Sequence, residues 1–305
     1  AAQAIARDTS WRVEIAVLGS GIGAIAAELA GKKAATVYAI ESPQLASYTS
    51  DATVYVLKEF LSARQPKLVL MPHTYQVRDF APRLALTLGK TVIPDAVGYK
   101  YEDGKLLFTR QMFQGKFAAD VSFTDDGPLW MATLQSGAFR SDQVEAGTAP
   151  IETVNVTVPD GTIRAQAHEV FKEARQSVDL SQSEVIVAVG RGIKEQKNLA
   201  MAEELATALG GDLAASRPIC DAGWLPLDRQ IGSSGQTIAP KLYIGLGISG
   251  AIQHIVGMKN SRTIIAINKD AEAPIFEIAD VGVVGNLFDI VPPLIAEIKK
   301  VKAGV

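Results

Sequence analysis

The chain has 305 residues, 48% of them hydrophobic and 21% charged, which is the composition of a globular protein long enough for two domains. Its formal net charge of −3 offers no basic face for nucleic acid, and no apolar run approaches the ~20 residues of a membrane-spanning helix. A single cysteine, Cys220, excludes an internal disulfide, and His73, His168 and His254 lie too far apart in sequence to indicate a metal site. We therefore expect no nucleic-acid partner, no direct membrane insertion and no metal.

Short apolar strands alternate with amphipathic helices in the first part of the chain. Strands are predicted over residues 12–18, 35–40, 68–71 and 91–93, and helices over 21–30, 50–63 and 79–88. This alternation predicts a parallel, doubly wound sheet. Because Ala1–Ala6 has the character of the last turns of a helix, we expect the native domain to begin one strand and one helix upstream. A targeting peptide is therefore neither predicted nor excluded.

Between Tyr99 and Val158 the helices disappear. Strands are predicted over residues 105–110, 117–123, 129–134 and 152–158, separated by turns rich in glycine and aspartate. We expect them to form an antiparallel extension of the first sheet. A polar connecting segment over residues 165–183 follows, which places a domain boundary near Ser181–Ser183.

A second alternating unit begins at Glu184. Strands are predicted over residues 185–189, 213–215, 242–246, 263–267 and 281–284, and helices over 198–209 and 286–300. The sequence thus predicts an α/β protein of two domains, residues 1–182 and 183–305, each with a doubly wound and mostly parallel sheet.

A glycine-rich loop, Gly19–Gly23, follows the first strand and opens a helix. Together with Ala24 it fits a dinucleotide-binding loop, and Glu41 lies at about the distance expected of the acid that binds a ribose. The alternative is a strand-to-helix turn that binds no ligand. The low specificity of one such loop favours the turn.

A second candidate site is spread over the C-terminal unit. Polar and glycine-rich groups follow its strands at Arg191, Ser216–Arg217, Gln230–Thr237, Gly247–His254 and Asn268. Each of them alone has an ordinary structural explanation, such as a surface cation, a packed histidine or a turn asparagine. Their shared position at strand ends, where open α/β sheets bind ligands, favours a site for a large anionic cofactor.

The same stretch closely resembles the FAD domain of electron-transfer flavoprotein alpha subunits. The resemblance is dense over roughly the last 120 residues, a domain-sized span. The motifs that carry it are Val189–Ile193, Ser216–Arg217, Asp221–Pro226, Gln230–Gly232, Ala239–Ile244, Gly247–His254, Ala266–Asp270, Ala273–Phe276 and Gly285–Phe288. The N-terminal domain resembles the family only in layout, and within this resemblance the Gly19 loop binds no cofactor.

The resemblance implies an FAD and a role for particular residues. Arg191 would lie near the adenosine diphosphate half, Ser216 would bond the cofactor, and Asn268 would contact the adenosine side. Arg217 would lie over the isoalloxazine, where a cation favours the anionic reduced flavin. Ser234 would approach flavin N5, and His254 would face the N1/O2 edge. The full set of implied contacts is Arg191, Ser216, Arg217, Gln230, Ile231, Gly232, Ser233, Ser234, Gly247, Ser249, Gly250, Ala251, Ile252, Gln253, His254, Asn268, Asn286 and Leu287.

The chain departs from the family pattern at two places. Ser233-Ser234-Gly235 stands where Gln-Thr-Gly is common, so the hydroxyl is kept but the threonine methyl is lost. Asn286 replaces the usual aspartate, which makes that contact neutral.

The resemblance implies an electron carrier, not an enzyme that acts alone on a small substrate. The carrier would pair with an electron-transfer flavoprotein beta subunit, accept electrons from flavin dehydrogenases such as acyl-CoA dehydrogenases, and pass them to a quinone reductase. The second domain would swivel, with residues 165–183 as the hinge. The compartment would be the cytoplasm of a bacterium or the mitochondrial matrix of a eukaryote.

Two further alternatives stay open at this point. One is the transfer-flavin subunit of an NADH-dependent bifurcating assembly, in which the beta subunit carries a second flavin. The other is a nicotinamide-dependent dehydrogenase that uses the Gly19 loop, although neither His73 nor His168 has an acid–base partner at motif spacing.

Overall fold

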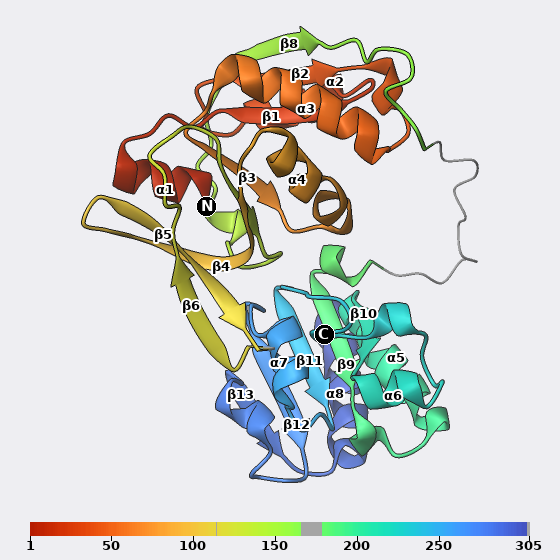
Figure 1. The fold of residues 1–305 in the computed structure, drawn as a ribbon. Coiled ribbons are helices and arrows are strands. Elements are labelled where there is room, and N and C mark those ends of the chain that lie inside the picture. The colour runs from red at the N-terminus through yellow and green to blue at the C-terminus, as the bar shows by residue number, and fades with distance from the viewer. Residues whose placement is uncertain (114, 166–178, 304–305) are drawn as a thin grey trace. The chain divides into compact units, whose positions relative to one another are not determined.

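The computed structural model describes residues 1–113, 115–165 and 179–303 of the chain (Figure 1). The chain divides into two compact units, one of Ala1–Gln111 with Ala118–Phe171 and the other of Met112–Phe117 with Lys172–Val305. Both units combine helices with mostly parallel sheets, so the expected α/β class is confirmed. Most of the expected connecting segment, together with His168, lies outside the described residues, and the boundary at residues 181–183 stays a prediction.

The first unit contains a three-stranded parallel sheet whose central strand is covered on both faces. Its strands are β1 (Ile15–Gly19), β2 (Val37–Glu41) and β8 (Ile151–Asn155), in the order β1-β2-β8. Tyr38 and Ile40 of β2 share a core cluster with residues of α3 (Ser50–Arg64), whereas Val37 and Ala39 pack with Ala26 of α2 (Gly23–Ala30). Because both faces are buried, β2 is an apolar run and not an alternating one.

A second, mixed sheet completes this unit. Its strands, in the order β3-β7-β4-β5-β6, are β3 (Leu68–Pro72), β7 (Trp130–Leu134), β4 (Val92–Glu102), β5 (Lys105–Met112) and β6 (Phe117–Val121). A tight turn at Asp103-Gly104, where both residues have positive φ, joins β4 and β5 as an antiparallel hairpin. The helices α1 (Ala2–Thr9) and α4 (Tyr75–Thr87) also belong to this unit. The side chain of Thr74 caps α4, which therefore begins earlier than the expected Asp79.

The antiparallel extension is shorter than we expected, because two of its predicted strands run parallel to their neighbours. β7 lies between β3 and β4 and is parallel to both, and β8 is parallel to β2. The buried run Met131–Thr133 explains β7, since a strand covered on both faces is typical of a parallel sheet. The stretch without predicted helices contains the antiparallel hairpin of β4 and β5. Further along the chain, β7 and β8 pair in parallel with earlier strands.

The second unit has a five-stranded parallel sheet with helices on both faces (Figure 1). The strand order is β10-β9-β11-β12-β13, with bounds β9 (Val185–Val189), β10 (Asp212–Ala215), β11 (Leu242–Leu246), β12 (Ile264–Asn268) and β13 (Val281–Val284). One core cluster joins one face to α5 (Leu199–Leu209) and α8 (Leu287–Ala303), and another joins the opposite face to α7 (Ile252–Met258). The sheet is thus doubly wound, as the alternation in sequence predicts.

The strand order places a switch point beside β9. The chain passes from β9 to β10 on one side and then crosses to β11 on the other, and both neighbours are parallel to β9. In open α/β sheets the loops at the carboxyl ends of the strands diverge at such a point and leave a crevice for a ligand. The loops after β9, β10 and β11 begin with Gly190, Ser216 and Gly247.

No helix among the described residues is long and apolar enough to cross a membrane. In the same part of the chain no group of His, Cys, Asp and Glu side chains is arranged to hold a metal ion.

Candidate functional site

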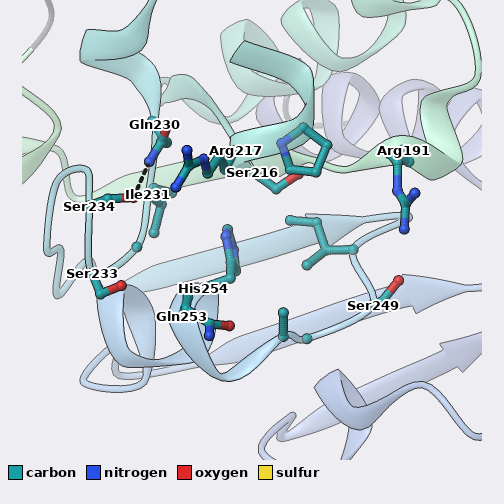
Figure 2. A pocket seen from close by; sticks show the side chains of 15 residues that line it. Arg191, Ser216, Arg217, Gln230, Ile231, Ser233, Ser234, Ser249, Gln253 and His254 are labelled. Atoms are coloured by element: carbon teal, nitrogen blue, oxygen red, sulfur yellow. Dashed lines mark hydrogen bonds between the residues drawn. The ribbon is translucent and has the colours of Figure 1, made fainter. Parts of the chain in front are cut away.

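A cavity of about 420 Å³ lies at the carboxyl ends of β9, β10 and β11 (Figure 2). This volume is in the range of cofactor sites, and the position is the crevice at the switch point. The residues that line it are Arg191, Ser216, Arg217, Pro218, Gln230, Ile231, Gly232, Ser233, Ser234, Ile248, Ser249, Gly250, Ala251, Gln253 and His254.

Glycines let the loops after β9 and β11 touch each other at the cavity. A Cβ on Gly190 would lie 2.4 Å from the carbonyl oxygen of Gly247, and one on Gly192 would lie 2.6 Å from its Cα. The Gly192 amide donates a hydrogen bond of 3.1 Å to the Gly247 carbonyl. This contact holds Arg191 beside the Ser249–Gly250 segment, so the glycines of the expected motif serve close packing.

Two guanidinium groups line the cavity. Arg191 lies in the turn after β9, and Arg217 is the first residue of the short helix α6 (Arg217–Asp221) after β10. Both arginines are exposed to solvent, and Arg217 Nε donates a hydrogen bond to Asp221 Oδ2 at 3.3 Å. Because the pair is exposed, it is weak, and the Arg217 guanidinium keeps donors for an anionic group.

The loop that carries Ser233 and Ser234 presents a hydroxyl group at the cavity. Gln230, which is buried, donates from Nε2 to Ser234 Oγ at 2.9 Å, as the dashed line in Figure 2 shows. A hydroxyl that already accepts this bond still has its own hydrogen to donate. The Ser233 amide donates to the Gln253 carbonyl at 2.8 Å, which ties this loop to α7.

His254 is, with Ser216 and Gln230, one of the buried polar residues of the cavity wall. It is 6% exposed, its Nε2 lies 2.7 Å from the Tyr243 hydroxyl, and its Nδ1 has no hydrogen-bond partner among the described residues. Burial lowers the pKa of His254 to about 4; the Ile231 backbone opposes that shift but makes no hydrogen bond of ordinary geometry to Nδ1. The imidazole is therefore neutral at neutral pH.

Some residues implied by the resemblance lie outside the cavity lining: Gly247, Ile252, Asn268, Asn286 and Leu287. Asn268 donates from Nδ2 to the Ile248 carbonyl at 2.9 Å and accepts from the Asp270 amide at 3.1 Å, so it supports the cavity loop. Asn286 bonds Asp289 and the Phe288 amide at the start of α8. Leu287 is buried in the core, and Ile252 is half exposed at the first turn of α7.

Two residues of the lining, Pro218 and Ile248, are absent from the implied contacts, although Ile248 lies within the Gly247–His254 motif. Neither carries a polar group that would attract attention. The only available signal was their position, since Pro218 follows Arg217 and Ile248 stands between Gly247 and Ser249.

The cavity fits the FAD that the resemblance implies. A buried nitrogen without a hydrogen-bond partner is costly unless a ligand supplies one, and within the described ranges His254 Nδ1 is such an atom. The Ser234 hydroxyl adds a donor, and Arg191 and Arg217 supply positive charge for a pyrophosphate or an anionic ring. These groups match a heteroaromatic cofactor with acceptor atoms and phosphates.

The backbone amides of the Gly19 loop are bonded by the carboxylate of Glu41 on β2. Glu41 accepts hydrogen bonds from the amides of Gly21 at 2.9 Å and Ile22 at 3.1 Å. These are the donors that a pyrophosphate would need. The acid expected to bind a ribose thus completes a turn, in agreement with the alternative that the loop binds no ligand.

A second, smaller polar cluster lies in the first unit. His73 Nδ1 is 2.7 Å from Thr133 Oγ1 and its Nε2 is 3.9 Å from Asp95 Oδ1, beside a cavity of about 180 Å³. Burial lowers the pKa of His73, and Asp95 opposes the shift. Sequence spacing showed no partner for His73, because β4 and β7 bring these residues together only in the folded sheet.

Comparison with known proteins covers both units. Residues 1–159 match the family model described as electron transfer flavoprotein domain, and residues 179–259 match the one described as electron transfer flavoprotein FAD-binding domain. The electron transfer flavoprotein subunit alpha of Bacillus subtilis (strain 168) is 39% identical over 285 residues, or 93% of this chain and 86% of that protein.

Two further relatives extend the match. The subunit alpha of Thermoanaerobacterium thermosaccharolyticum is 37% identical over 303 residues, which is 99% of this chain and 92% of the relative. The mitochondrial subunit alpha of Dictyostelium discoideum is 34% identical over 304 residues, with 95% and 84% covered. The resemblance seen in the C-terminal motifs is confirmed and reaches into the first unit. The chain belongs to the family of electron-transfer flavoprotein alpha subunits, and its C-terminal unit contains the FAD-binding domain of that family.

Proposed function

We propose that the cavity at the carboxyl ends of β9, β10 and β11 holds FAD and that the chain works as an electron carrier. The observation that carries the proposal is the buried Nδ1 of His254. It has no hydrogen-bond partner among the residues that the structure describes, and His254 lines this cavity together with the Ser234 hydroxyl and two guanidinium groups. Bound FAD would supply one- and two-electron chemistry, which side chains do not provide.

The chain's own groups bind and orient the cofactor in this proposal. Arg191 and Arg217 attract the negative charge of the cofactor. Ser234 donates a hydrogen bond to it, and the neutral His254 donates another from the buried wall of the cavity. Asn268 and the glycine contact between the loops after β9 and β11 keep these donors in place. In this proposal the FAD-binding residues lie within 183–305, and residues 1–182 serve as scaffold and partner contact.

Alpha subunits of this family pair with a beta subunit and transfer electrons. As a finer statement, we propose that this carrier accepts electrons from flavin dehydrogenases, such as acyl-CoA dehydrogenases, and passes them to a quinone reductase. Its compartment is the cytoplasm of a bacterium or the mitochondrial matrix, as the named bacterial and mitochondrial relatives suggest.

The other candidate functions have less support. A bifurcating assembly needs a second flavin on the beta subunit, and none of the residues that line the alpha cavity supports that function over the simple carrier. A nicotinamide dehydrogenase needs an open Gly19 loop, whereas Glu41 occupies the amides of Gly21 and Ile22.

The proposal is tested by counting flavin in the purified alpha–beta complex and in two tryptophan variants. Ser249 is exposed and lines the cavity, so Ser249→Trp fills the site without entering the core. We expect a single FAD in the wild-type complex and at least a ~tenfold lower occupancy in Ser249→Trp, because a ring in the cavity excludes the ligand.

Ala239→Trp is the matched control, since Ala239 is exposed in the same unit and lies outside the cavity lining. It should keep full occupancy. A complex without flavin, or equal occupancy in both variants, would refute the proposed site. Two flavins in the wild type would favour the bifurcating assembly.

A further inference from the structure

A buried tyrosine lies directly behind the cavity histidine. Tyr243 of β11 is 0% exposed, and its hydroxyl lies 2.7 Å from Nε2 of His254 on α7. Either group can supply the proton of this bond, because a neutral imidazole carries one proton on one of its two nitrogens. The direction of the bond therefore determines which nitrogen of His254 can act as a donor.

The surroundings of the tyrosine determine this direction. The structure gives the Tyr243 hydroxyl no second hydrogen-bond partner among the described residues. If Nε2 carried the proton, the buried hydroxyl would accept it and its own hydrogen would have no acceptor, which is costly in a dry core. If the hydroxyl donates, its hydrogen is satisfied and Nε2 is the acceptor. The proton of the ring then resides on Nδ1.

The charge of the ring leads to the same donor. Burial holds the pKa of His254 at about 4, and the charged side chains that line the cavity with it, Arg191 and Arg217, are both positive. Neither favours a second proton. Nδ1 has no hydrogen-bond partner in the described part of the chain, and the Ile231 backbone makes no bond of ordinary geometry to it, so its N–H is a buried donor that can serve a ligand acceptor in the cavity.

We propose that Tyr243 is a positioning residue, which holds His254 as the neutral Nδ1–H tautomer so that the ring offers the bound cofactor a hydrogen-bond donor and not a cation. The part of this inference that concerns the cofactor rests on the proposed FAD site. The part that concerns the tautomer rests only on the Tyr243–His254 contact. The two parts can be tested separately.

The tautomer is measured by ¹⁵N NMR of histidine-labelled alpha–beta complex with FAD bound. Protonated and unprotonated ring nitrogens have widely separated ¹⁵N shifts, and with three histidines in the alpha chain, His73→Gln and His168→Gln variants complete the assignment there. We expect Nδ1 of His254 to be protonated and Nε2 unprotonated at pH 6 to 8. A protonated Nε2 at these pH values would overturn the proposal.

The role of Tyr243 is measured by the FAD affinity of single and double variants. Tyr243→Phe keeps the ring in the core but removes the hydroxyl, so we expect mixed ¹⁵N shifts at His254 and an FAD Kd higher by about tenfold. His254→Asn restores a donor as many bonds from the backbone as Nδ1, and this donor does not depend on Tyr243. In that background, Tyr243→Phe should change the Kd by less than about twofold.

Tyr38→Phe is the matched control. Tyr38 is a buried tyrosine of the first unit whose hydroxyl accepts a bond of 2.7 Å from Arg64, and it is not part of the cavity lining. It should leave the FAD affinity and the His254 shifts unchanged. Unchanged shifts and Kd in Tyr243→Phe would overturn the positioning role. Equal FAD occupancy in Ser249→Trp and Ala239→Trp, with the Nδ1–H tautomer of His254 intact, would instead count against the FAD site alone.

Discussion

His254 shows how burial changes the chemistry of a single side chain. An exposed histidine could become a cation near neutral pH and stabilise an anionic flavin by its charge. In this cavity the pKa is about 4, so the ring is a neutral hydrogen-bond donor, and the positive charge comes from Arg191 and Arg217. Glu41 shows the opposite effect of context, since the acid that fits a dinucleotide motif completes a turn.

His254 should make the stability of the flavin-free chain depend on pH. Its folded-state pKa of about 4 lies below the ordinary value of 6.5, so the unfolded chain binds the proton more tightly. The free energy of unfolding should therefore fall as the pH drops from 6.5 to about 4, with a loss of ~3 kcal/mol from this group. Urea unfolding across this range measures it.

The His254→Asn variant has no group at this position that titrates between pH 6.5 and 4, so it is the control for the wild type. The variant should show a pH dependence flatter by the contribution of His254, although His73 still adds its own. Parallel curves for the wild type and the variant would mean that His254 titrates alike in the folded and unfolded chain.

At the scale of elements, the site depends on how closely the loops after β9 and β11 approach each other. Gly190 and Gly192 meet Gly247 at distances that no Cβ tolerates, with backbone atoms on both sides. Side chains at these positions would push apart the segments that carry Arg191 and Ser249. The glycines of the Gly190-Arg191-Gly192 motif are thus needed for packing, and Arg191 lies between them for binding.

Gly192→Ala should therefore weaken both the fold and the site. Its Cβ would lie 2.6 Å from the Gly247 Cα, and relief of this contact should cost ~1–3 kcal/mol of unfolding free energy and lower FAD affinity. Gly23→Ala at the start of α2 meets nothing within 4 Å and serves as the control. Chemical unfolding and FAD titration should separate the two variants; equal behaviour would show that the loops yield without cost.

At the scale of the whole molecule, the first unit has two sheets and the second has one, each unit has its own core clusters, and the proposed FAD contacts belong to the second unit. Ligand binding stabilises the states that contain the site, by about 2.7 kcal/mol when the free ligand is at 100 times its Kd. If the units unfold independently, this stabilisation appears in only one of them.

Hydrogen exchange with and without FAD should reveal this division. We expect slower exchange in β9, β11 and α7 on FAD binding and little change in β1, β2 and β8, because only the first group supports the cavity. Mass spectrometry of peptides from both units measures it. Equal protection in both units would show that they unfold as one and would count against a boundary near residues 181–183.

Local patterns in the sequence determined the α/β class, the strands of the C-terminal sheet, the glycine-rich loops at their ends and the family. These features depend on short-range periodicity and on motifs that are contiguous in the chain. The tertiary structure decided which groups meet: the place of β7 between β3 and β4, the closure of the Gly19 loop by Glu41, and the bond from Tyr243 to His254. Such pairs are set by strand order and helix packing, and the charge of a buried imidazole depends on both, so composition and spacing could not determine them.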